Sequence, residues 1–114
     1  MLSPKQLINI LREDFSISLK DEKIIFILNL LESKLEKYGV IEKAEFFTPE
    51  NMDTATLSLG NEYVEVYIYH VLSKEAILQG DITRLNTYSA LYNAALQNLF
   101  SENQSRKISF KNLW

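Results

Sequence analysis

The chain has 114 residues, of which 46% are hydrophobic and 24% are charged, so its length and composition predict one folded domain and exclude a disordered chain. Twelve Lys and Arg against fifteen Asp and Glu give a net charge of −3, which argues against a domain that grips the phosphate backbone of DNA. The absence of cysteine excludes disulfides, zinc fingers and cysteine catalysis, and no apolar run is long enough for a membrane span or a signal peptide, so we expect a cytoplasmic protein without membrane contact.

The N-terminal part predicts two amphipathic helices. Ser3 and Gln6 form a capping box at the start of a short helix over residues 4–14. A second helix follows, with Ser18 and Asp21 as alternative caps. Apolar residues three and four apart predict its buried face: Ile24, Leu28, Leu31, Leu35 and Tyr38. Four more widen that surface, so the first half of this helix is expected to be buried on more than one side: Ile25, Phe26, Ile27 and Leu30.

Residues 40–61 are the irregular part of the chain, with a turn at residues 48–51 and a candidate short strand at residues 54–59. The following residues fit two structures. Because apolar and polar side chains alternate over residues 63–70, they fit a strand in a hairpin. The competing interpretation is one helix over residues 61–79, which we favour because no turn separates Tyr69 from the plainly helical residues after it.

The C-terminal part predicts a long helix and a tail. Gly80 ends the preceding helix and Asp81 caps the next, which extends to about Glu102. So short a connection predicts an antiparallel helix pair. The expected fold is therefore mainly α: a small bundle of about four helices in a single domain at residues 1–104, followed by an extended tail at residues 105–114.

The sequence offers no set of residues for chemistry. His70 is the only histidine, and we interpret it as a half-buried or interface residue rather than a catalytic base. Four acidic residues of the irregular part have no metal-loop spacing and predict a solvated loop: Glu42, Glu45, Glu50 and Asp53. We therefore expect no enzymatic activity, no cofactor and no metal site.

Two groups of apolar and aromatic residues are candidates for protein contacts. Tyrosines are concentrated in the last two predicted helices. They fit core residues with their hydroxyls at the rim, contacts between subunits, or both. The candidate subunit contacts are Tyr67, Tyr69, Tyr88 and Tyr92. The tail either folds back on the core or docks on another chain, and its candidate docking residues are Ile108, Phe110, Leu113 and Trp114.

Several segments also carry a resemblance to a known family. They are residues 51–57, 62–67, Gly80-Asp81, Arg84-Leu85-Asn86 and Tyr92-Asn93-Ala94-Ala95. Together they form a pattern of a Tyr-rich helix, a Gly-acidic turn, an Arg-x-Asn helix start and an aromatic-Asn-Ala-Ala stretch. In this pattern, residues 51–100 resemble the small head–tail connector (adaptor or head-completion) proteins of tailed phages and prophages of Gram-positive bacteria. Leu85 departs from the pattern, which usually has Tyr there, and the N-terminal half matches in layout alone.

The resemblance implies an all-α subunit of a ring, typically twelvefold, beneath the portal protein of the virion. Such a ring assembles in the host cytoplasm, extends the DNA channel without binding the double-stranded DNA specifically, and offers a docking surface to the next neck or tail protein. In similar proteins the C-terminal segment reaches the portal. The alternative from another class is a small helical regulatory protein, such as a phage-encoded inhibitor or a toxin–antitoxin partner, which binds one target.

Overall fold

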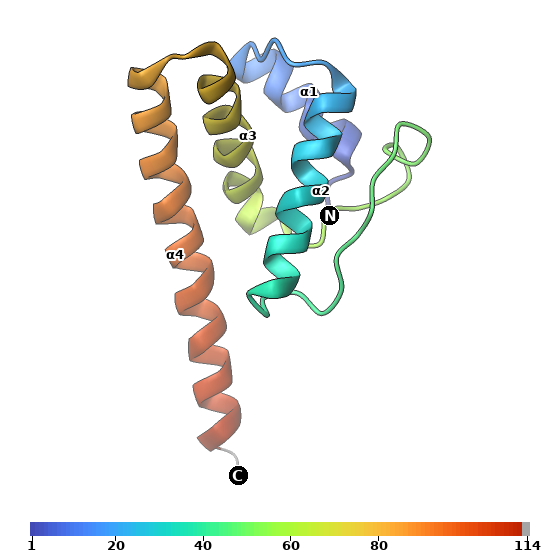
Figure 1. The fold of residues 1–114 in the computed structure, drawn as a ribbon. Helices are drawn as coiled ribbons and strands as arrows, with labels where there is room; N and C mark the ends of the chain where they lie inside the picture. The colour runs from blue at the N-terminus through green and yellow to red at the C-terminus, as the bar shows by residue number, and fades with distance from the viewer. Residues whose placement is uncertain (113–114) are drawn as a thin grey trace.

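The computed structural model describes the backbone of residues 1–112 and the side chains of residues 1–103. Its elements are α1 (Pro4–Phe15), α2 (Asp21–Lys37), the short 3-10 helix η1 (Asn61–Tyr63), α3 (Val64–Gln79) and α4 (Ile82–Asn112). No strand is present in residues 1–112. The mainly α fold with four helices is thus confirmed (Figure 1).

The first two helices begin and end close to the expected positions. Ser3 and Gln6 form the predicted capping box, with each side chain bonded to the other residue's backbone N–H. The prediction of a side-chain cap on α2 is wrong, because the N-cap residue is Lys20 and makes no such bond. Asp21 is instead the first residue of α2, and Ser18 bonds to another helix.

The structure decides between the hairpin and the helix for residues 63–70 in favour of the helix. Nearly every residue of α3 from Val66 to Ala76 is buried, since α2 lies on one side of it and α4 on the other. This explains why its apolar residues follow no single face. At the end of α3, Gly80 adopts the left-handed conformation with φ of +68°, and the Asp81 carboxylate accepts the Arg84 backbone N–H at 3.1 Å, as expected for a cap.

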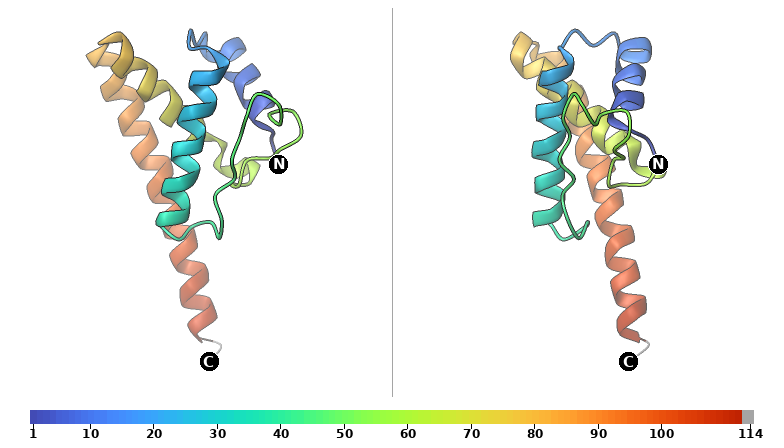
Figure 2. Two further views of the ribbon diagram at one scale, coloured as in Figure 1. Left: turned by 45° about the vertical axis from the view of Figure 1, so that its right-hand side comes forward. Right: turned by 90° about the vertical axis from the view of Figure 1, so that its right-hand side faces the viewer.

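α4 packs antiparallel to α3 and is much longer than expected. It has 31 residues, whereas α3 has 16, so its C-terminal part runs past the other elements (Figures 1 and 2). The sequence placed the end of this helix near Glu102 and an extended segment after it. The structure differs, because the helical backbone continues to Asn112 and residue 104 lies inside α4.

Residues 40–60 form an irregular loop that wraps along α2 and the start of α1 (Figure 1). The backbone N–H and carbonyl of Phe47 bond to the Asn29 side chain at 2.8 and 2.9 Å, and the Phe47 ring is buried. Further along, the Leu57 N–H donates to the Leu2 carbonyl at 2.9 Å. The candidate strand at residues 54–59 does not form. These bonds replace a regular hydrogen-bond ladder as the means of holding the loop.

A buried carboxylate connects this loop to the helices. Glu32 of α2 is fully buried, and its carboxylate accepts hydrogen bonds from the Ser58 N–H at 3.1 Å, from the Ser58 hydroxyl, and from the Tyr67 hydroxyl at 2.8 Å. The Tyr67 oxygen in turn accepts the Leu59 N–H at 3.0 Å. Three donors thus bond to Glu32 and a fourth bonds to Tyr67. Because a buried charge is costly unless it is hydrogen-bonded, the loss of any one of these donors should weaken the whole network.

A second buried carboxylate lies near the other end of α3, where it connects neighbouring elements. Glu75 of α3 accepts the N–H and hydroxyl of Ser18 at 2.7 and 2.9 Å, and it pairs with Arg84 of α4 at 3.0 Å. Gln79 bonds to both Ser18 and Arg84. The segment before α2, the end of α3 and the start of α4 therefore meet at one acidic side chain.

We predict that Tyr67→Phe destabilises the fold by about 1–3 kcal/mol, because it removes a donor from Glu32 and leaves the Leu59 N–H without its acceptor. Urea unfolding at neutral pH measures the loss, and the Leu59 amide should also exchange faster with deuterated solvent. Tyr69→Phe is the matched control, since Tyr69 lies on the same helix, is only half-buried and has an aromatic rather than a hydrogen-bonding contact. Equal effects of the two changes would contradict this role for Tyr67.

Candidate protein-interaction surface

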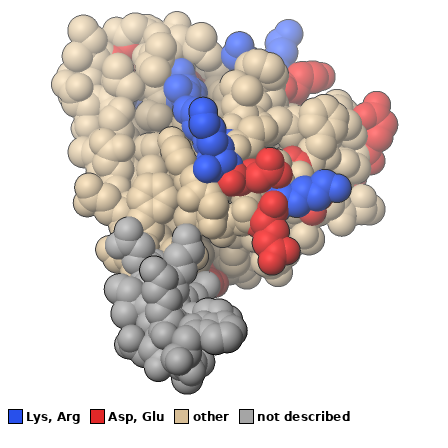
Figure 3. All heavy atoms as spheres, turned by 60° about the horizontal axis from the view of Figure 1, so that its bottom comes forward, with Lys and Arg blue, Asp and Glu red and all other residues tan. Residues whose placement is uncertain are grey.

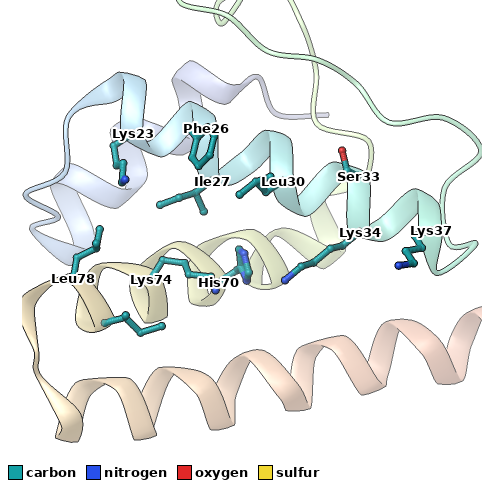
Figure 4. A pocket seen from close by; sticks show the side chains of 11 residues that line it. Lys23, Phe26, Ile27, Leu30, Ser33, Lys34, Lys37, His70, Lys74 and Leu78 are labelled. Atoms are coloured by element: carbon teal, nitrogen blue, oxygen red, sulfur yellow. The ribbon is translucent and has the colours of Figure 1, made fainter.

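A groove of about 470 Å³ lies between α2 and α3 on one side of the molecule (Figure 4). Its floor and walls are largely apolar. Four large side chains are each half-exposed there, at 55%, 50%, 52% and 57%: Phe26, Leu30, Ile77 and Leu78. The expectation that Phe26 and Leu30 would be buried is therefore wrong, because no element of the described residues covers this side of α2. Exposed apolar side chains gathered in one place mark a binding surface more often than single ones do.

The rim of the groove is basic. Lys23, Lys34 and Lys37 come from α2 and Lys74 comes from α3, and no acidic residue is among those that line the groove (Figure 4). The Lys23 ammonium lies 5.8 Å from the centre of the Phe26 ring. In a chain with a net charge of −3, four lysines around one apolar groove give it a local positive potential.

The sequence analysis missed this basic rim although a signal was present. The α2 lysines are eleven and then three residues apart, which places them on one face of a helix. Acidic residues between them hide the pattern in a count of charges. Lys74 could not be added from sequence, because it reaches the same groove from another helix.

His70 lies at the floor of the groove and is only 4% exposed. It packs against Tyr92 of α4 with the ring centres 4.9 Å apart. Burial, followed by the charges of Lys74 and Lys34, lowers the pKa of His70 to about 4. The ring is therefore neutral at physiological pH and more deeply buried than the expected half-buried histidine.

The four tyrosines that were proposed as subunit contacts have different environments in the structure. Tyr67 is fully buried and bonded to Glu32, so its assignment to a surface contact is wrong. Tyr69 and Tyr88 stack on each other across α3 and α4 at 6.2 Å, and the pKa of Tyr92 is raised chiefly by burial. Tyr69, Tyr88 and Tyr92 are each half-buried, so their role as subunit contacts stays a prediction.

The four proposed docking residues of the tail are not placed. Ile108 and Phe110 lie on the backbone of α4, but their side chains lie outside the described part of the chain, as do Leu113 and Trp114 entirely. No group of three or more His, Cys, Asp or Glu that could hold a metal ion occurs among the residues described. Within the same residues, none of the helices is long and apolar enough to cross a membrane.

Comparison with known proteins identified no relative of this chain. A scan against protein-family models gave no match, and searches of curated proteins and of solved structures gave none either.

We predict that His70 makes folding stability depend on pH between about 6.5 and 4. The unfolded chain binds a proton at His70 near pH 6.5 but the folded chain only near pH 4, so stability is complete above this range and falls as the pH drops through it. The full shift corresponds to a loss on the order of 3 kcal/mol. His70→Gln should remove that part of the pH dependence, at a packing cost of about 1 kcal/mol at neutral pH.

The measurement is urea unfolding of the wild type and of His70→Gln at pH 7, 6, 5 and about 4.5. The informative quantity is the difference between the two proteins at each pH, because carboxylates that titrate in the same range affect both equally. A difference that stays constant with pH would show that His70 is not held in its neutral form.

Proposed function

We propose that this chain is a structural subunit of the head–tail junction of a tailed bacteriophage, which joins copies of itself in a ring beneath the portal protein. There it extends the channel for double-stranded DNA and offers a docking surface to the next neck or tail protein. The resemblance of residues 51–100 to head–tail connectors supports this proposal. Its motif residues have structural rather than chemical roles here, since Gly80, Asp81 and Arg84 form the corner between α3 and α4.

The observation that carries the proposal is the length of α4. A helix of 31 residues that packs along one of 16 forms an arm that leaves the domain (Figure 2). A helical arm satisfies its own backbone hydrogen bonds and can reach a neighbouring protein without disturbing the domain. We therefore assign portal docking to the C-terminal part of this arm, with Ile108, Phe110, Leu113 and Trp114 as its apolar contacts. The helical backbone up to Asn112 favours docking as a helix in a groove over the addition of a strand to a partner's sheet.

The charge distribution suits a subunit of a DNA channel. No charged residue occurs between Arg84 and Glu102 of α4. Figure 3 shows the consequence as an uncharged area on the side where α4 runs, whereas charged side chains gather elsewhere on the same face. An uncharged helix can pack closely on a neighbouring copy or face passing DNA without holding the phosphates.

The basic groove favours a second candidate function. A small helical regulatory protein would use such a groove to bind one acidic target and would act as a monomer or dimer. The mass of the particle in solution at rising concentration, with and without portal protein, distinguishes a ring subunit from such a regulator.

We predict that truncation after Gln104 abolishes binding to the portal complex while the domain stays folded. Even the contacts of α4 nearest to the cut lie before it: the buried Leu99, the ring of Phe100 against Tyr38 at 5.6 Å, and Glu102 bonded to Tyr63. The truncated chain should keep its melting behaviour to within a few degrees. Binding should weaken at least about 100-fold, because two large aromatic side chains are removed.

A full-length variant separates docking from folding in the same experiment. Phe110→Ser with Ile108→Ser keeps the length of the arm and should also weaken binding. Normal portal binding by either variant, or unfolding of the truncated chain, would refute the arm as the docking element.

A further inference from the structure

One exposed aromatic ring stands out on the loop of residues 40–60. The Phe46 side chain is 71% exposed, more than any other large apolar side chain described, although the next residue, Phe47, is buried. The backbone beside it is fixed: the Ala44 N–H donates to Glu36 at 2.7 Å, and the Asn51 side chain donates to the Phe46 carbonyl at 3.1 Å. The loop therefore presents this ring in a preset position, which lowers the entropy cost of a contact.

The neighbours of Phe46 are acidic. The exposed carboxylates of the loop are those of Glu42, Glu45, Glu50 and Asp53, against the single basic residue Lys43. The loop thus presents an exposed apolar ring with negative charge around it, and on its own chain that ring lines a second hollow beside Phe26 and Leu30. The groove between α2 and α3 is an apolar hollow surrounded by the four lysines, with no acidic residue among those that line it. One chain therefore carries two apolar surfaces of opposite charge, which adjoin each other at Phe26 and Leu30.

We propose that copies of this chain associate by this pair of surfaces, with Phe46 and its acidic neighbours on one copy seated in the lysine-rimmed groove of another. The inference rests on the proposed function in naming a second copy as the partner, and it identifies the contact between those copies. Phe46 packs among Phe26, Leu30 and Ile77 of the receiving copy, while Glu42 and Glu45 approach its Lys34 and Lys74. Surfaces that are different and complementary lead to rings or open arrays when each copy uses both in the same direction.

The lysines of the groove favour an acidic partner for a physical reason. Lys34 of α2 and Lys74 of α3 line the same groove, and both contribute to the lowered pKa of His70, so the empty groove holds like charges that repel each other. An acidic loop relieves that repulsion, and the contact should weaken as salt screens the charges.

Charge reversal on each surface tests the contact. One variant carries Lys34→Glu and Lys74→Glu in the groove, and the other carries Glu42→Lys and Glu45→Lys in the loop. None of these four side chains makes a hydrogen bond or an ion pair within the described residues, so both variants should fold. Each variant alone should self-associate much more weakly, because residues 42 and 45 then face residues 34 and 74 with the same sign of charge, although Lys23 and Lys37 keep part of the rim basic. An equal mixture should associate, because residues 42 and 45 of each variant then face opposite charges at residues 34 and 74 of the other.

The apolar part of the contact has its own pair of variants. Phe46→Ala should raise the dissociation constant for self-association at least about tenfold. Ile82→Ala is the matched control, because Ile82 is 70% exposed at the start of α4 and lies outside both surfaces. Sedimentation velocity over a range of protein concentrations, at about 0.05 and about 0.5 M NaCl, measures both.

The outcomes separate this inference from the proposed function. A wild-type chain that stays monomeric at about 1 mM in low salt overturns the inference. So does a mixture of reversed variants that does not associate, or an equal loss from Ile82→Ala. If copies gather only on the portal, and do so normally with Phe46→Ala, the inference fails while the connector function stands. If the mixture associates only as a closed dimer, the contact is supported and the ring is not.

Discussion

The burial of the Glu32 carboxylate determines how the irregular loop of residues 40–60 sits on the helices. The loop of residues 40–60 has no secondary structure, so its position depends on side chains that substitute for a hydrogen-bond ladder. Glu32 supplies the strongest of these, with two donors from Ser58 and one from Tyr67. Since an ionised carboxylate in the core is tolerated only when its donors are all present, the loop and α3 are fixed relative to α2 together. Nearer to Phe46, separate bonds of Phe47 to Asn29 and of Ala44 to Glu36 hold the loop on α2.

Glu75 has the corresponding role at the other end of the helices. It holds Ser18, just before α2, and Arg84, just after α4 begins. α2 and α3 are therefore connected by polar contacts at both ends, while between these ends one side of the pair is left open. That open side is the groove. A surface between two rigidly held helices keeps its shape before a partner arrives, which is the condition for binding without a large entropy cost.

Local patterns predicted the helices, except for the end of α4, and three of their caps, but none of the polar contacts between elements that are distant in sequence. The caps at Ser3, Gly80 and Asp81 depend on neighbours within four residues, and all three form as expected. In the sequence, Glu32 looks like a solvent-exposed charged residue in the second half of a helix. Its partners Ser58 and Tyr67 lie 26 and 35 residues away, so no local pattern indicates them. Tyr67 was assigned to a surface contact for the same reason. Its partner, the Leu59 N–H, belongs to a segment whose sequence has no periodicity, so the hydrogen bond could not be predicted. Periodicity identifies the apolar face of Phe26 and Leu30 but cannot say whether another element covers it.

The separation of charge within one chain has a thermodynamic consequence at His70. Its neutral form is favoured by burial and by Lys74 and Lys34, and an acidic group that enters the groove opposes the effect of those lysines. An apolar ring seated over His70 has the opposite effect, because it deepens the burial that is the main cause of the lowered pKa. By linkage, association and protonation of His70 strengthen each other where the carboxylates prevail, and they oppose each other where the burial prevails. The sign of the change in association as the pH falls from about 6 to about 4 therefore measures which part of the contact acts more strongly on His70.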